Sequence, residues 1–149
     1  MDFQRILFPV DLSDHAKTCL VWGARLVTPD KTREVHFLYV LHTPADYCTW
    51  SGDPLVDVEQ HVDEFVREFN ADGRVERKIA VRTGHPSTEI CKYAADKECD
   101  LIVMATHGRT GLGHMVLGST AEQVVRHASC PVLTMRIDTQ SLAKTSRDE

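Results

Sequence analysis

The sequence predicts an α/β domain in which helices cover both faces of a parallel sheet of five strands. Apolar runs of strand length alternate with segments of helical periodicity along the chain. No turn signal joins two consecutive strands as a hairpin, which favours crossover connections through helices. The length of 149 residues, of which 42% are hydrophobic and 26% charged, is that of one globular domain.

The N-terminal part of the chain predicts a strand, a helix and a second strand. Residues 6–10 (ILFPV) form an apolar run, as in a strand that is buried on both faces. Ser13 is a suitable N-cap for the next helix, whose apolar residues recur at helical spacing as far as the turn at residues 28–30. Residues 34–41 (EVHFLYVL) are rich in Val, Phe and Tyr and predict the second strand.

The middle of the chain predicts two helices separated by a strand. Pro54 opens the first helix after a connection over residues 42–53, and the helix carries one apolar stripe. It ends at residues 70–73 (NADG). Residues 78–82 (KIAVR) alternate in polarity as a strand does, and Pro86 opens the second helix.

The C-terminal part contains the most apolar strand and an unusually long loop. Residues 100–106 (DLIVMAT) predict a buried strand, and residues 131–137 (PVLTMRI) predict the last strand. A glycine-rich loop over residues 107–117 leads into a helix that begins at Gly118 and Ser119. The polar tail, residues 138–149, has no periodicity, and we expect it to be frayed.

Composition and charge exclude several classes of partner. The net charge of −5 excludes a basic surface of the kind that binds nucleic acid or anionic membranes. No apolar run approaches the length of a membrane span, and the N-terminus does not have the pattern of a secretory signal. The five cysteines are scattered without a C-x-x-C pair, as is typical of reduced thiols. We therefore expect a cytoplasmic protein.

The glycine-rich loop has the chemistry of a phosphate-binding site. In sheets of this class, ligands bind outside the carboxyl ends of the strands, where the strand order reverses. Glycines let backbone N–H groups approach an anion, and the N-terminus of the following helix directs more N–H groups to the same place. Arg109 adds a positive charge. Asp11, which ends the first strand, can accept hydrogen bonds from ribose hydroxyls or help to hold a phosphate-bound cation.

Each of these features also has a purely structural interpretation. Ser119 and Glu122 have the spacing of a capping box, in which the two residues satisfy each other's backbone donors. Asp11 is favourable near the N-terminus of the first helix through the helix dipole alone. The loop matches neither the P-loop pattern nor the dinucleotide fingerprint, so those two chemistries are not indicated.

Motifs for catalysis are not found in the sequence. The eight histidines form no H-x-x-x-H pair and no cluster with cysteine that would suit zinc. There is no G-x-S-x-G elbow, and the H-x-G-H and S-G-G-x-D-S motifs of nucleotide-dependent transferases of related fold are also missing. The sequence therefore predicts at most a slow hydrolysis of a bound nucleotide.

Together, these segments resemble the universal stress protein family in its single-domain, nucleotide-binding form. The family signature is G-x-x-G, nine residues, then G-[ST]. The chain has Ala105-Thr106-His107-Gly108, nine residues and Gly118-Ser119, with alanine at the first glycine. The segments ILFPVDLS, LYVLH and SCPVLTMR also match, so that the resemblance covers residues 1–137 as one domain.

The resemblance implies a sheet of order 3-2-1-4-5 that binds ATP or AMP between strands one and four. Mg²⁺ or Mn²⁺ is a candidate companion of the phosphates. Adenine would lie near Pro9, Val10 and Val40, with backbone hydrogen bonds around Val40 and with Met104 lining the base pocket. Asp11 would face the ribose. Ala105 would lie close to the ribose, where its methyl group fits if the local φ is negative and clashes if the position demands a positive φ. The phosphates would contact Gly108, Arg109, Gly118, Ser119 and Thr120.

The resemblance also suggests a partner, and the sequence leaves two functional hypotheses open. Members commonly form homodimers through the last strand, here Val132, Leu133, Thr134, Met135 and Arg136, and pairing would protect this apolar edge. The first functional hypothesis is an adenine-nucleotide-binding regulatory protein of the stress response. The alternative is a protein-interaction module of the same fold, which binds no nucleotide and docks a partner through its loop and edge strand, with Tyr47 and Trp50 within reach.

Overall fold

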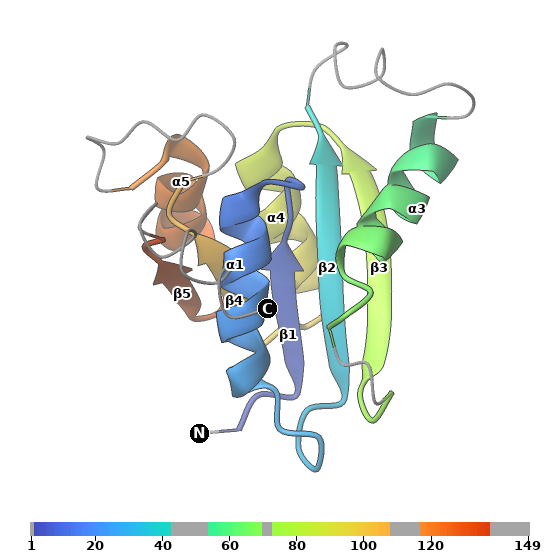
Figure 1. The fold of residues 1–149 in the computed structure, drawn as a ribbon. Coiled ribbons are helices and arrows are strands. Elements are labelled where there is room, and N and C mark those ends of the chain that lie inside the picture. Colours follow the sequence, from blue (N-terminus) through green and yellow to red (C-terminus); the bar gives the residue numbers. More distant parts are fainter. Residues whose placement is uncertain (1, 43–53, 70–72, 108–116, 138–149) are drawn as a thin grey trace.

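The computed structural model describes residues 2–42, 54–69, 73–107 and 117–137 (Figure 1). The strands are β1 (Arg5–Pro9), β2 (Glu34–Leu41), β3 (Glu76–Thr83), β4 (Leu101–Ala105) and β5 (Val132–Met135). The helices are α1 (Asp14–Gly23), η1 (Ala24–Leu26, a 3₁₀ turn), α3 (Pro54–Phe65), α4 (Pro86–Asp96) and α5 (Ser119–His127).

The five strands form one parallel sheet in the order β3-β2-β1-β4-β5, which confirms the predicted fold class and strand order. Helices α1 and α3 cover one face of the sheet, and α4 and α5 cover the other (Figure 1). Because every crossover passes through a helix, the carboxyl ends of all strands lie at one edge of the sheet. The order reverses between β1 and β4, where a ligand crevice is expected.

Two apolar cores hold the layers together, one on each face of the sheet. Between the sheet and α1 and α3, the rings of Phe8, Phe37 and Phe69 pack with centroids 5.1–5.8 Å apart. On the opposite face, the core contains Leu38 from β2 and Ile90 from α4. Successive residues of β2 therefore belong to different cores, as strand geometry requires.

Several element boundaries differ from those that periodicity predicts. The helical spacing continues to residue 27, but α1 ends at Gly23 and is followed by a tighter 3₁₀ turn. The last strand covers only Val132–Met135, because its partner β4 ends at Ala105, opposite Met135. Arg136, predicted as part of the strand, therefore follows it. The prediction of a frayed tail concerns residues 138–149, which lie outside the described residues.

None of the helices in the described part of the chain is long and apolar enough to cross a membrane.

Candidate functional site

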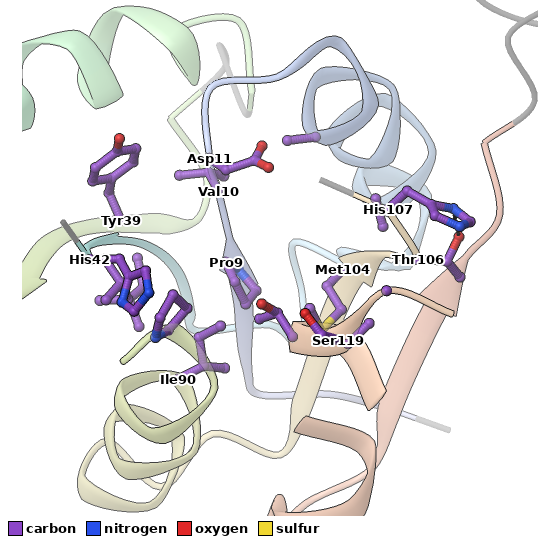
Figure 2. Close-up of a pocket in the computed structure, with 18 residues that line it drawn as sticks. Pro9, Val10, Asp11, Tyr39, His42, Ile90, Met104, Thr106, His107 and Ser119 are labelled. Carbon is purple, nitrogen blue, oxygen red and sulfur yellow. Dashed lines mark hydrogen bonds between the residues drawn. The ribbon is translucent and has the colours of Figure 1, made fainter. Parts of the chain in front are cut away.

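A crevice opens where β1 stops pairing with its neighbours. β1 pairs with β2 through all five of its residues but with β4 only at Ile6 and Leu7. Pro9 has no N–H to donate, and the Val10 N–H makes a last bond of 2.9 Å to the Leu38 carbonyl before the chain turns into α1. Beyond this point, β2 and β4 continue without β1 between them. The result is a cavity of about 500 Å³ (Figure 2).

Nine of the eleven predicted site residues line this cavity. They come from β1, β2, β4, α5 and the segments that follow the strands: Pro9, Val10, Asp11, Val40, Met104, Ala105, Gly118, Ser119 and Thr120. The other two predicted residues, Gly108 and Arg109, lie outside the described residues. Figure 2 shows Ser119 and His107 on one side of the cavity, His42 and Ile90 on the opposite side, and Pro9 and Val10 between them.

The loop from β1 to α1 closes the N-terminus of α1 with its own side chains. The Ser13 hydroxyl accepts a bond of 3.1 Å from the Ala16 N–H, so Ser13 is the N-cap that the sequence predicts. The same hydroxyl donates to a carboxylate oxygen of Asp11, which also accepts from the Ser13 N–H at 3.1 Å. Leu12, between them, has a φ of +62°, a left-handed conformation that is unusual for leucine. These bonds hold the Asp11 carboxylate at the rim of the cavity.

The N-terminus of α5 is built differently. Its N-cap is Gly118, which has no side chain to cap the helix, and the first bond within the helix runs from the Glu122 N–H to the Gly118 carbonyl at 2.9 Å. The capping box suggested by the sequence is therefore wrong: Ser119 already lies inside the helix and Gly118 occupies the cap position. The first-turn N–H groups of a helix have no partner within it, so those of α5 are presented to the cavity.

Gly118 is also the residue that fixes where α5 begins. Its N–H donates a bond of 2.7 Å to the Thr106 carbonyl at the end of β4. A Cβ atom at Gly118 would lie 2.7 Å from the same oxygen, which is far closer than carbon and oxygen can pack. Only glycine lets the end of β4 and the beginning of α5 approach this closely.

The α4 side of the cavity is apolar. Leu38 and Val40 of β2, Met104 of β4 and Ile90 of α4 share the core on this face of the sheet or pack against it, and all four line the cavity. Pro86, at the first turn of α4, also lines it. Sequence reasoning did not include Leu38, Ile90 and Pro86 among the site residues, because Leu38 lies inside strand β2 and the other two lie on α4, which follows the edge strand β3. For Ile90, the hydrophobic face of α4 was the available signal.

Polar side chains at the rim come from the segments that follow β1, β2 and β4. Asp11 is the only carboxylate among the described residues that line the cavity. Nδ1 of His42 donates to the Gly84 carbonyl at 3.3 Å, and Nδ1 of His107 lies 3.0 Å from Oγ1 of Thr106. Within the described part of the chain, no three His, Cys, Asp or Glu side chains converge to hold a metal ion.

Ala105, at the first glycine position of the signature, lies within β4 opposite Met135. Among the described non-glycine residues, positive φ values occur only at Leu12 and Glu98, so the backbone at Ala105 has the negative φ that alanine accepts. Its methyl group packs against the core on the α1 face. The position therefore does not require a glycine.

The sequence of the chain matches a known protein family. The family model for the universal stress protein family matches residues 2–136. Universal stress protein MJ0531 of Methanocaldococcus jannaschii is 30% identical, with 90% of this chain and 82% of that protein covered. A universal stress protein of Thermus aquaticus is 31% identical, with 90% and 99% covered.

Solved structures show the same fold. The structure of MJ0577 from M. jannaschii matches with a TM-score of 0.79 at 27% identity, covering 93% of this chain and 99% of that one. Three more distant structures are nucleotide complexes: a universal stress protein with cAMP (16% identity, TM-score 0.67), an Arabidopsis thaliana family member with AMP (23%, 0.64) and an Archaeoglobus fulgidus protein with dAMP (19%, 0.65). They cover 93%, 92% and 90% of this chain and 100%, 94% and 98% of their own. From its sequence match over nearly its whole length, the chain belongs to the universal stress protein family.

Proposed function

We propose that this protein binds an adenine nucleotide, AMP or ATP, in the cavity between β1 and β4 and acts in the stress response as a nucleotide-dependent regulator. The observation that carries the proposal is the combination, in one cavity, of an apolar lobe, a carboxylate and a helix N-terminus whose N-cap, Gly118, has no side chain. The volume of about 500 Å³ lies within the roughly 300–1,000 Å³ typical of small-molecule sites. The complexes of related structures with AMP, dAMP and cAMP support this assignment.

The apolar lobe suits the base. Along a strand, backbone groups alternate between the two neighbouring strands, and the Leu38 carbonyl points toward β1 because it accepts from Val10. The N–H and carbonyl of Val40, two residues on, therefore point to the same side, where β1 no longer continues. A donor and an acceptor side by side match the ring nitrogen and the exocyclic amino group of adenine. Pro9, Val10 and Met104 supply apolar contacts.

Asp11 suits the ribose. Its carboxylate is an acceptor of hydrogen bonds, and the bonds from Ser13 fix its orientation before any ligand arrives. Ribose hydroxyls are donors, and an oriented acceptor binds them without losing side-chain entropy. We therefore assign the two hydroxyls of the sugar to the rim formed by Asp11.

The N-terminus of α5 suits the phosphates. The backbone N–H groups of Ser119 and Thr120, with the Ser119 hydroxyl, converge there beside Gly118. Each hydrogen bond to a charged group contributes about 1.5–3 kcal/mol, so three supply most of the roughly 8 kcal/mol of a micromolar complex once ordering costs are subtracted. Gly108 and Arg109 would complete this site from the glycine-rich loop. Mg²⁺ or Mn²⁺, if needed, would be held through the phosphates.

Calorimetric titration with AMP, and with ATP in the presence and absence of Mg²⁺ or Mn²⁺, tests the proposal. We expect micromolar binding, and we expect Asp11→Asn to weaken it by about tenfold, the effect of losing a charged hydrogen bond. Asp14→Asn is the matched control, because Asp14 is an exposed residue of the first turn of α1 that does not line the cavity. If the wild-type protein binds neither AMP nor ATP, the alternative of an interaction module without nucleotide replaces this proposal.

We also propose that two copies of the chain pair through β5. This strand lies at the edge of the sheet, and Leu133 on it is 38% exposed although it is apolar. Light scattering should show a dimer that Leu133→Asp converts to a monomer, whereas Val125→Asp, on the exposed face of α5, should leave the dimer intact. A wild-type monomer would contradict this part of the proposal. The interaction surface around Tyr47 and Trp50 lies outside the described residues.

We also propose that the protein acts in a reducing compartment such as the cytoplasm. The cysteines of the described segments, Cys19, Cys91, Cys99 and Cys130, are all free thiols, which supports it.

A further inference from the structure

A chain of three polar side chains, of which His36 and Tyr93 are buried and Glu34 is partly exposed, lies in the seam between β2 and α4, outside the cavity lining. Nδ1 of His36 is 2.9 Å from the Tyr93 hydroxyl, and Nε2 of His36 is 3.0 Å from a carboxylate oxygen of Glu34. His36 and Tyr93 are each only 3% exposed. Burying polar groups to this extent costs folding free energy unless each has a hydrogen-bond partner. The folded state therefore favours the one arrangement in which these side chains bond to one another.

The chemistry of the three groups fixes the direction of both hydrogen bonds. The Glu34 carboxylate can only accept, because the bond from His36 lowers its pKa and keeps it ionised. Nε2–H of His36 therefore donates to Glu34. Burial lowers the pKa of His36, which keeps the ring neutral, so its Nδ1 accepts from the Tyr93 O–H. Burial raises the pKa of Tyr93 to about 12, and its hydroxyl remains a donor.

The chain lies one layer below the floor of the base lobe. Alternation along β2 places His36 on the same face as Leu38 and Val40, and Tyr93 follows Ile90 by three residues on the same side of α4. Leu38, Val40 and Ile90 line the cavity, whereas His36 and Tyr93 do not. The hydrogen bond between His36 and Tyr93 thus joins α4 to β2 immediately beneath the point where α4 forms the cavity wall.

We propose that Glu34, His36 and Tyr93 are positioning residues for the base lobe: their hydrogen-bonded chain holds α4 against β2 and so sets the place of Ile90 in the cavity wall. This inference rests on the proposed nucleotide binding. It gives the seam a role in ligand affinity that the lining residues alone do not reveal.

The same arrangement makes the contact of α4 with β2, and so the position of the cavity wall, sensitive to pH. A proton on Nδ1 of His36 would turn this nitrogen from an acceptor into a donor, so it could no longer accept from the Tyr93 O–H. It would also place a positive charge in the seam. The charged or titratable groups around His36 and Tyr93 come from each element packed against them. They are Glu34 on β2, Lys97 and Cys99 after α4, Lys78 and Arg82 on β3 and Arg5 on β1. Lys78 and Lys97 oppose the charge and Glu34 favours it. Burial lowers the pKa of His36, so its protonation, below the pH at which an ordinary histidine titrates, should loosen the contact of α4 with β2.

Two variants separate positioning from simple stability. Tyr93→Phe removes only the hydroxyl and leaves the ring. The double variant His36→Leu/Tyr93→Phe replaces both hydrogen-bonding partners with apolar groups, a change that often has little effect on folding stability. Adenosine is the probe, because it has no group that titrates between pH 5.5 and 7.5. Thr32→Val is the control, since it removes another buried hydroxyl, which donates to the Phe3 carbonyl before β2 begins and takes no part in the bonds of His36 with Tyr93 and Glu34.

We expect Tyr93→Phe to weaken adenosine binding at pH 7.5 by about threefold or more, within the range that mutations exert through neighbouring elements. The double variant should bind within about twofold of wild type. As the pH is lowered below the range in which an ordinary histidine titrates, wild-type affinity should fall by more than that of the double variant, which retains His42 and His107 but lacks His36. Thr32→Val should lose stability and keep its affinity. Equal affinity and equal pH dependence in all four proteins would overturn the inference.

A measurement without ligand distinguishes this inference from the proposed function. The NMR signal of the Ile90 δ-methyl group should shift in Tyr93→Phe, and the amides of α4 should exchange faster, while those of α1 do not change. If wild type binds neither adenosine nor AMP, the proposed function fails, and an unaltered Ile90 signal would then count separately against the positioning role.

Discussion

Replacing Gly118 with alanine adds one methyl group at the point where β4 and α5 come closest. The new Cβ would lie 2.7 Å from the Thr106 carbonyl oxygen, a backbone atom that cannot rotate away. Ordinary contact begins near 3.4 Å, so β4 and α5 must separate by about 0.7 Å. The backbone at Gly118, with φ −67° and ψ 157°, is acceptable for alanine, and the effect is therefore purely steric.

The separation should weaken phosphate binding more than base binding. It lengthens the bond from the Gly118 N–H to Thr106 and moves the first-turn N–H groups of α5 away from the anion. Loss of one hydrogen bond to a charged group costs about 1.5–3 kcal/mol, which corresponds to at least about a tenfold loss of AMP affinity. Adenosine, which has no phosphate, should lose less than about threefold. The strain itself should lower the free energy of unfolding by about 1–3 kcal/mol.

Calorimetry with AMP and adenosine, together with urea unfolding, measures both effects. Gly23→Ala is the matched control, because a methyl group there meets the Phe8 ring and Val103 in the core on the α1 face and lies outside the cavity lining. We expect it to reduce stability without changing AMP affinity. If Gly118→Ala binds AMP as tightly as wild type, the contact of Gly118 with Thr106 does not set the position of the α5 amides, and the reasoning is refuted.

Three further predictions concern stability. Glu98 has a φ of +51° after α4, so Glu98→Gly should raise the free energy of unfolding by about 0.5–1 kcal/mol and the thermal midpoint by about 1–4 °C; a lower midpoint would contradict this. Ser13→Ala removes the acceptor of the Ala16 N–H and should lower the free energy of urea unfolding by about 1 kcal/mol. Burial raises the pKa of Cys19 and Cys99 to about 12, whereas both thiols ionise near pH 9 when unfolded, so stability should fall as pH rises from 9 toward 12. Denaturant titrations should show a smaller fall in Cys19→Ala.

The order of elements could be read from the sequence because each depends on local patterns. The apolar run before Asp11, the cap at Ser13 and the prolines that open α3 and α4 all act within one or two turns of chain. The strand order came from the resemblance to the family. The resemblance, together with the rule that ligands bind where strand order reverses, was also enough to bring nine predicted residues into one cavity.

Contacts between distant segments decided the features that local patterns could not predict. Sequence spacing assigned the helix cap to Ser119, but the approach of Gly118 to Thr106 at the end of β4 moves the helix start and makes Gly118 the cap. His36 and Tyr93 are 57 residues apart, and no local pattern links them. Periodicity reports which face of an element is buried and not which element covers it. The partner is chosen only when the whole sheet and its helices pack together, because that is when each buried polar group must find its bond.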